Sequence, residues 1–420
     1  MDASLYGGSR EQFARSFFGC IIIMLIPVIV KSTLLPAVNF TALMASAFVL
    51  QVLWCLTLVI AGHAITISVV SVLFLLNACL GMVINALSGR GINSYDLINI
   101  SVKIGSLILF VDTVTRKTVS REKLSKYAKC MMLLSIIACI YNLGINSYGI
   151  VKALTTNGSA YAVNIKSFFL NRNQFGMFLV VSYVVTDYAY VGKRSRTKSL
   201  VHIFQAANIV LTLSRGSVLA VVAYSIARQL FFIENRKKLW RFITMSICAG
   251  ILTIMVIQTP QLNSFVTNKL LRIDAGDTGR TDVWLMGLQV FLNNPIHGVG
   301  TYTGLNIAIA QGFKYEQFHN FFIDILVSGG IIELSITLFI LTKIYKRCMR
   351  NLKGTEYIAI YQSSMIALLC MGCIESVSFF SMGYVDTLFT INFVTLPLLM
   401  ANMTKTNRNS HILHESYSVL

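Results

Sequence analysis

Charged residues are scarce in this chain, where Asp, Glu, Lys and Arg together make up 12% of 420 residues. A soluble domain carries roughly 25% charged residues, so the composition excludes a chain built from soluble domains. Apolar residues reach 55%, and long uncharged runs recur from Phe17 to Met403. A run of about 20 apolar residues is what the hydrocarbon core of a bilayer requires. The sequence therefore predicts a single integral membrane domain over residues 1–420, an all-α polytopic bundle of helices packed in lipid.

The motifs of soluble enzymes are also missing. The chain has no P-loop, no dinucleotide fingerprint, no GxSxG and no His/Cys metal spacing. An Asp-x-Asp motif is absent as well, which disfavours a transferase that uses a sugar nucleotide. We therefore expect no cofactor and no metal. The first apolar run lacks a small-residue cleavage pattern, so we expect a membrane helix there and no cleavable signal peptide. The nine cysteines fall in predicted helices or at cytoplasmic edges, so no disulfide framework is expected.

The net charge of +18 is concentrated in short basic clusters between the apolar runs. These clusters lie at 115–129, 192–198, 234–241 and 343–353, and Lys405 and Arg408 follow in the C-terminal tail. Clusters of this kind mark cytoplasmic loops by the positive-inside rule, so a lipid bilayer is expected as partner and nucleic acid is not.

About twelve membrane spans are predicted from the apolar runs. They are 14–30, 38–60, 64–87, 95–114, 130–146, 174–191, 199–213, 217–233, 242–258, 320–342, 356–378 and 385–403. With twelve spans, every basic cluster and both termini fall on one side of the membrane, which is then the cytoplasmic side. The longest loop of the opposite side is 259–319, between the predicted ninth and tenth spans. It is expected to be partly helical, because Thr281 or Asp282 can cap a short apolar helix that Pro295 ends.

Three arginines are expected on the extracytoplasmic side. Arg215 lies between two apolar spans, Arg280 precedes the predicted loop helix, and Arg172 opens the sixth span. Only a guanidinium holds a phosphate in a bidentate, permanently charged contact, so the set suggests an anionic lipid headgroup. The alternative for Arg215 is an anchor at the membrane interface. The Ser and Gly beside it permit a close approach of helices and leave helix N–H groups nearby for a phosphate.

Histidine and acidic residues supply the remaining candidates. His319, followed by Asn320 at the start of the tenth span, can take a proton from a sugar hydroxyl or serve only as a hydrogen-bonding residue. Asp324, one turn further, can orient the imidazole or belong to a packing pair. Glu333 and Glu375 lie within predicted spans, where they are candidates for a proton or ion pathway, or for pairing with each other or a helix terminus.

A series of short motifs then resembles the O-antigen ligase/polymerase superfamily, which includes the Wzy-type polysaccharide polymerases. The motifs are Leu213-Ser214-Arg215-Gly216, Gly279-Arg280-Thr281-Asp282-Val283-Trp284, Asn294-Pro295-Ile296-His297-Gly298-Val299-Gly300, His319-Asn320-Phe321-Phe322 and Gly329-Gly330-Ile331. They occur in the family's order between about Asn171 and Ile340, whereas the N-terminal helices resemble the family only in character.

The resemblance implies a GT-C-like membrane glycosyltransferase that needs no metal. Its donor would be a glycan on undecaprenyl pyrophosphate, used at the extracytoplasmic face of a bacterial plasma membrane. Catalytic roles fall to His319 as the base and to Arg215 and Arg280 as the cations that hold the leaving group. Substrate-binding roles fall to Arg172, Asn171, Asn173, Gly298, Gly300 and Asn320. A flippase and a chain-length regulator of the same pathway are the implied protein partners.

Three functions remain open at this point. A polymerase would extend O-antigen, capsule or exopolysaccharide, and it is favoured by the Asn-x-Asn-x-x-Gly pattern of Asn171, Asn173 and Gly176 and by the His-Asn-Phe-Phe element. A ligase would transfer the glycan to lipid A-core, completing lipopolysaccharide, or to protein. A lipid-linked oligosaccharide flippase belongs to a different class, and we expect it to place its cations in a central cavity between two similar halves.

Overall fold

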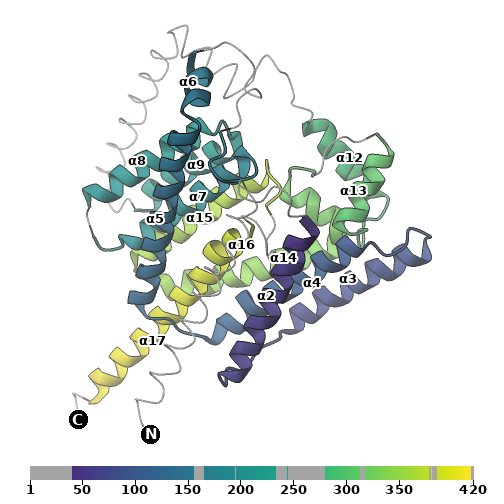
Figure 1. The fold of residues 1–420 in the computed structure, drawn as a ribbon. Coiled ribbons are helices and arrows are strands. Elements are labelled where there is room, and N and C mark those ends of the chain that lie inside the picture. The colour runs from purple at the N-terminus through teal and green to yellow at the C-terminus, as the bar shows by residue number, and fades with distance from the viewer. Residues whose placement is uncertain are drawn as a thin grey trace. The chain divides into compact units, whose positions relative to one another are not determined.

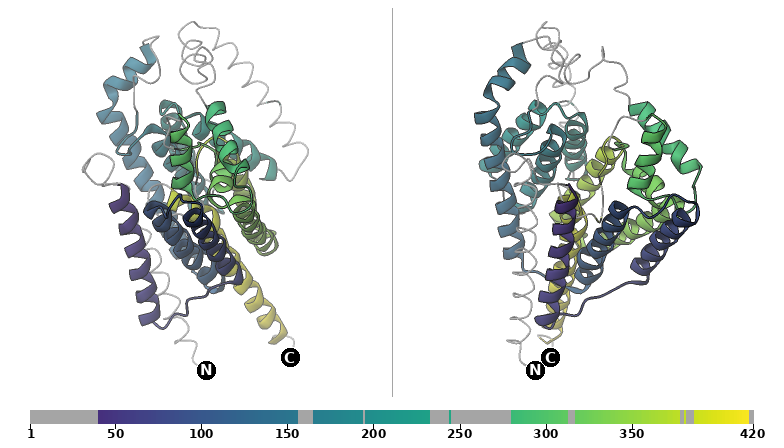
Figure 2. Two further views of the ribbon diagram at one scale, coloured as in Figure 1. Left: turned by 90° about the vertical axis from the view of Figure 1, so that its right-hand side faces the viewer. Right: turned by 45° about the vertical axis from the view of Figure 1, so that its right-hand side comes forward.

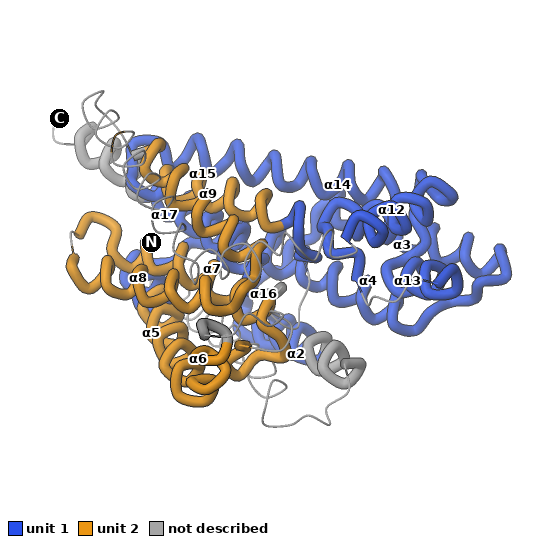
Figure 3. Tube along the Cα trace, turned by 90° about the horizontal axis from the view of Figure 1, so that it is seen from above, with its two compact units in different colours: residues 1–127, 279–358, 372–420 blue, residues 128–278, 359–371 orange. Residues whose placement is uncertain are grey.

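The computed structural model describes residues 40–155, 165–193, 195–232, 244, 280–312, 317–377, 380 and 386–417. These residues form helices and no strand. The chain divides into two compact units, coloured separately in Figure 3. Unit 1 comprises 1–127, 279–358 and 372–420, and unit 2 comprises 128–278 and 359–371. The predicted span 14–30, the span 242–258 apart from residue 244, and residues 259–279 of the long loop lie outside the described residues.

Unit 1 contains the first helices of the chain, the helices of the long loop and the last helices (Figure 1). They are α2 (Phe40–Ile60), α3 (Val69–Leu87), α4 (Ser94–Leu107) with its π-helical extension η1 (Ile108–Thr113) and the 3-10 turn η2 (Val114–Arg116), α12 (Arg280–Leu292), α13 (Thr301–Ala310), α14 (Phe321–Leu352), α16 (Asp386–Phe389), η6 (Thr390–Thr395) and α17 (Leu396–Tyr417). The short helix predicted in the long loop is confirmed as α12, but the predicted cap is wrong, because Thr281 and Asp282 lie within its first turn.

Helices α4 and α14 of unit 1 run in the same direction. Lys103 of α4 contacts Glu333 of α14, and further along both helices the Thr115 carbonyl accepts a hydrogen bond from Arg347 at 2.6 Å. Helix α3 runs the opposite way, since Asn77 donates to the Gly329 carbonyl and Asn85 to the Val299 carbonyl. The N-termini of α4 and α14 consequently lie at one end of the unit, where α12 and α13 also pack (Figure 2, green against blue).

Helix α14 is broken at Gly329 and Gly330, whose backbone angles are not helical. The break leaves carbonyl and N–H groups of the helix without their usual partners, and the segment after α12 bonds to them. Val299 N donates to the Val327 carbonyl at 2.9 Å, and Gly300 N to the Ser328 carbonyl at 2.8 Å. In the other direction, Ile331 N donates to the Pro295 carbonyl at 2.9 Å. The Gly-rich loop segment is thus fixed to the break in the first third of α14.

Unit 2 holds most of α5 (Arg121–Ile145), then α6 (Ser147–Thr155), α7 (Arg172–Ala189), α8 (Arg196–Leu211), α9 (Arg215–Phe232) and most of α15 (Glu356–Gly372). A buried polar seam joins its helices. Gln205 of α8 donates to Ser135 of α5 at 2.7 Å and to Thr186 of α7 at 3.3 Å. Buried polar groups need such partners, so the seam fixes the packing of otherwise apolar helices.

Four described helices are long and apolar enough to cross a membrane: Val69–Leu87, Ser94–Thr113, Arg121–Ile145 and Phe321–Leu352. The predicted spans that the structure describes each overlap a helix, but α5 begins well before its predicted span, and α14 and α17 continue well beyond theirs. The chain is therefore a helical membrane protein.

Candidate active site

A buried carboxylate lies between two of the predicted catalytic residues. Glu375 is 3% exposed and follows the end of α15 in a non-helical segment. Its Oε1 accepts a hydrogen bond from Arg280 Nη2 at 2.8 Å, and its Oε2 lies 3.5 Å from His319 Nδ1. Arg280 and His319, which are 39 residues apart in sequence, are therefore brought together by an acid that the sequence analysis considered only as an intramembrane group.

The three side chains come from the ends of helices. Arg280 is the first residue of α12, and His319 precedes Asn320, the N-cap of α14. The Asn320 side chain accepts hydrogen bonds from the N–H groups of Phe322 and Ile323 and donates to the Cys373 carbonyl at 3.0 Å. Asn320, predicted to bind substrate, thus ties the start of α14 to the segment that carries Glu375.

The backbone at His319 is strained, because its φ of 51° lies in the left-handed region. Its carbonyl accepts a long hydrogen bond, 3.4 Å, from Trp284 Nε1 of α12. A non-glycine residue in this region costs of order 1–3 kcal/mol and is typical of functional sites. The surrounding contacts therefore hold the imidazole in an orientation that a relaxed backbone would not give.

The electrostatics of the cluster favour a carboxylate in its charged form. Burial raises the pKa of Glu375, but the contacts with His319 and Arg280 outweigh burial and hold that pKa below its ordinary value. A negative charge facing Nδ1 favours the tautomer of a neutral imidazole that carries its proton on Nδ1 and leaves Nε2 as the acceptor. Arg280 and His319 remain 19% and 27% exposed, so both can reach a substrate.

Arg172 and Arg215 lie in unit 2 and begin two neighbouring helices, α7 and α9. The starts of these helices approach closely at Gly176, where an added Cβ would be 2.4 Å from Ser217 Oγ and 3.2 Å from Ser214 Cβ. The expected close approach near Arg215 is therefore confirmed, although Gly176 of α7 provides the space. Leu213 precedes the turn with a φ of 55°, so the backbone is strained here too.

Asn171 caps α7, because its side chain accepts a hydrogen bond from Gln174 N at 2.9 Å. This capping explains why an asparagine stands at the position. Asn173 lies in the first turn of the same helix, half-buried. The structure brings Asn171, Arg172 and Asn173 to the same helix end as Arg215, and their binding of substrate remains a prediction.

Gly298 and Gly300 have positive φ values of 64° and 86°. A Cβ at Gly298 would lie 2.6 Å from the backbone of α14, and one at Gly300 would lie 2.6 Å from Asp96 Oδ2. Both glycines are therefore required by the backbone and by its close contacts. Their predicted role in substrate binding is an additional claim that these contacts do not test.

Glu333 does not pair with Glu375, which excludes one of the alternatives considered for it. Its Oε1 lies 3.0 Å from Lys103 Nζ, and the two side chains are 8% and 10% exposed. Lys103 also donates to Ser328 beside the break in α14. Lys103 was not predicted from the sequence, because a single lysine in an apolar run gives no indication of its partner, which is 230 residues away.

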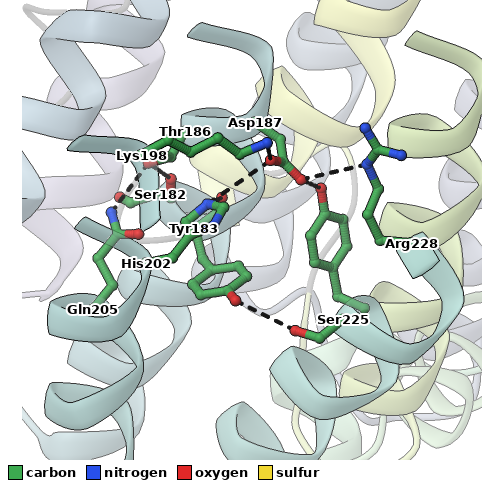
Figure 4. Close-up of polar contacts among 10 residues, drawn as sticks. Ser182, Tyr183, Thr186, Asp187, Lys198, His202, Gln205, Ser225 and Arg228 are labelled. Atoms are coloured by element: carbon green, nitrogen blue, oxygen red, sulfur yellow. Dashed lines mark hydrogen bonds and ion pairs between the residues drawn. The ribbon is translucent and has the colours of Figure 1, made fainter. Parts of the chain in front are cut away.

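A second ionic cluster, at Asp187 in unit 2, was also missed. Figure 4 shows the Asp187 carboxylate facing Lys198 and Arg228, and Tyr224 donates to its Oδ2 at 2.5 Å. Asp187 lies 15 residues after Arg172 on α7, which is about 22 Å along the helix. The contacts join α7, α8 and α9 at the end away from Arg215. The sequence feature that could have predicted this cluster is a single acid, Asp187, at the end of an apolar run that is followed by the basic cluster containing Lys198.

Residues 200–338 match a family model described as O-antigen ligase. The matched segment includes Arg215, Arg280 and His319. No curated protein matches the chain.

Proposed function

We propose that the chain is a polysaccharide polymerase of the O-antigen ligase/polymerase superfamily, because its residues 200–338 match the O-antigen ligase family model. It joins oligosaccharide repeat units carried on undecaprenyl pyrophosphate, at the extracytoplasmic face of a bacterial plasma membrane. The observation that carries the proposal is the arrangement of Arg280 and His319 on the buried Glu375.

The chemistry of the transfer needs a base and cations. His319 takes the proton of the acceptor hydroxyl at Nε2 while Glu375 holds Nδ1–H. The hydroxyl oxygen then bonds to the anomeric carbon of the donor, and the bond from that carbon to the pyrophosphate oxygen breaks. The proton passes from His319 to solvent, and undecaprenyl pyrophosphate leaves. A single in-line displacement of this kind inverts the anomeric centre.

The leaving pyrophosphate needs positive charge and no nucleotide. Only one nitrogen of Arg280 bonds Glu375, so its other N–H groups are available to phosphate oxygens. Arg215 and Arg172 are assigned the same chemistry by their residue type and helix-start position. Removing one preorganised charge contact typically costs about 3 kcal/mol, on the order of a hundredfold in rate.

A ligase that transfers the glycan to lipid A-core or protein would use the same residues, and the family match does not separate the two activities. A cellular experiment tests the proposal. His319→Ala is expected to remain in the membrane, to abolish long-chain glycan and to leave repeat-unit lipid on the outer leaflet. Accumulation on the cytoplasmic leaflet contradicts the proposal and favours a flippase. Loss of glycan from lipid A-core, with long chains still made on the carrier lipid, identifies a ligase.

A further inference from the structure

A hollow of about 440 Å³ opens in unit 1 between the starts of α4 and α13. Ligand-binding clefts have volumes of roughly 300–1,000 Å³, so the size suits a small organic group. The lining residues are Ile92, Asn93, Ser94, Tyr95, Tyr302 and Asn306. They include aromatic, amide and hydroxyl side chains and no charged one. We call this feature the Tyr95–Tyr302 hollow.

The two tyrosines are held in place by a buried carboxylate below them. Helix α13 begins after Gly300, which has no side chain to cap it. Asp96 of α4 replaces the cap, accepting hydrogen bonds from Tyr302 N at 2.8 Å and Thr303 N at 2.9 Å. Since Tyr95 adjoins Asp96 in sequence, its ring lies beside that of Tyr302, with centroids 5.5 Å apart and planes inclined by 39°. The aromatic surface is therefore preorganised.

Polar groups surround the aromatic surface. Asn93 uses its Oδ1 to cap α4 through Tyr95 N, which leaves its amide N–H groups for a ligand. Asn306 is exposed, and its side chain makes no hydrogen bond within the described part of the chain. Aromatic faces suit the C–H side of a pyranose, and amides suit its hydroxyl edge, as in other small-molecule sites.

Three charged side chains near the hollow line a separate, narrower cavity. That cavity shares Ile92 and Asn93 with the hollow and is lined by Asp96, Lys103 and Glu333. Its volume of about 20 Å³ admits a water molecule and nothing larger. A ligand in the hollow therefore contacts only uncharged side chains. This lining suits a sugar, whereas a phosphate would need a cation that the lining does not contain.

We propose that the Tyr95–Tyr302 hollow binds a saccharide of the lipid-linked glycan, away from its pyrophosphate. The proposal rests on the proposed function, because the polymerase reaction supplies the ligand. The N-termini of α4 and α14 lie at the same end of unit 1, so the hollow and His319 share that end. The hollow then positions the glycan while Arg280 and His319 act at the bond that is exchanged.

The test uses detergent-purified full-length protein and the oligosaccharide that mild acid releases from the host's lipid-linked repeat unit. Wild type is expected to bind this probe in equilibrium dialysis, and Tyr302→Ala and Tyr95→Ala to weaken binding by about tenfold or more, since about 1.4 kcal/mol is a factor of ten. Tyr302→Phe retains the ring and is expected to bind within a few-fold of wild type, by the same scale. Tyr148→Ala removes a tyrosine that is 78% exposed on α6 and should change nothing. The proposal is overturned if wild type does not bind or if both alanine variants bind as tightly as wild type.

Two further measurements distinguish the donor glycan from the acceptor glycan, and the proposed saccharide site from the proposed function. A lipid-linked repeat unit that lacks its acceptor hydroxyl serves only as donor. A raised KM of Tyr302→Ala for this compound assigns the hollow to the donor glycan, and a raised KM for the acceptor alone assigns it to the acceptor. His319→Ala is expected to bind the free oligosaccharide normally. Should the wild type bind it through Tyr302 yet transfer no glycan, the proposed function fails and the hollow stands.

Discussion

Arg280 Nη2 donates to Glu375 Oε1 at 2.8 Å, which connects the first residue of α12 to a segment 95 residues later in the chain. Glu375 is almost fully buried, and its second oxygen faces His319. One carboxylate thus sets the position of a cation and of a base. The geometry assigns Glu375 as a positioning residue, because it acts through Arg280 and His319.

A double-mutant cycle tests this connection. Glu375→Gln keeps the side-chain volume and removes the charge, so Arg280 loses its partner and His319 its orientation. We expect kcat for glycan transfer to fall on the order of 10- to 100-fold. Arg280→Gln should show a similar loss, and the double variant should lose much less than the product of both. Strictly multiplicative losses would show that the two residues act independently.

Acid should weaken the same contact. The pKa of Glu375 is below its ordinary value of 4.5, so the pair's contribution to stability is fully present above that value. It is lost as the pH falls through the lower, folded-state pKa. We expect the difference in melting temperature between wild type and Glu375→Gln, measured in detergent, to narrow as the pH falls below 4.5. A difference that widens below pH 4.5 contradicts a lowered pKa.

Gly300→Ala is expected to destabilise unit 1 and to lower transfer. The new Cβ would meet Asp96 Oδ2 at 2.6 Å, in a backbone conformation that L-residues rarely adopt. Gly312→Ala is the matched control, because Gly312 also has a positive φ but nothing lies within 4 Å of its Cβ. In the control, the free energy of unfolding should fall only by the cost of a positive φ at alanine, of order 1 kcal/mol. Equal melting temperatures of the two variants would rule out the contact with Asp96.

Gly176→Ala tests the close approach of α7 and α9. The Cβ would collide with Ser217, so the helix starts that carry Arg172 and Arg215 must separate. We expect a higher KM for the lipid-linked donor with little change in membrane insertion. Gly144→Ala, in α5 with nothing within 4 Å of the added Cβ, should leave KM unchanged. An unaltered KM in Gly176→Ala would mean that the spacing of these starts does not matter.

Asp187→Asn should destabilise unit 2 without acting on the chemistry. It leaves Lys198 and Arg228 without their buried counter-charge, and removing one partner of such a pair typically costs about 3–5 kcal/mol. The melting temperature should fall, while KM of the remaining folded protein stays as in wild type. Glu122→Gln breaks an exposed helical pair and serves as the control, with no measurable shift expected. A stable Asp187→Asn variant would show that the cluster does not hold the helices.

Local pattern predicted the helices well. The apolar runs and the Thr281–Pro295 pattern gave elements that the structure contains, because their length and periodicity are properties of neighbouring residues. The partners of single charged residues were not predictable. Glu375 pairs with Arg280, and Glu333 pairs with Lys103. Each partner is more than 90 residues away, and tertiary packing that cannot be read from residue spacing brings the pair together. His319 and Arg280 were identified by residue type and resemblance, and the acid between them only by the structure.

The central claim is tested most directly with purified protein in liposomes, supplied with lipid-linked repeat units and no other acceptor. We predict a ladder of longer lipid-linked glycans from wild type, unchanged by EDTA, and none from His319→Ala or Arg280→Ala. A ladder of equal intensity from His319→Ala, or its loss from wild type on adding EDTA, would contradict a metal-independent transfer that uses His319 as base.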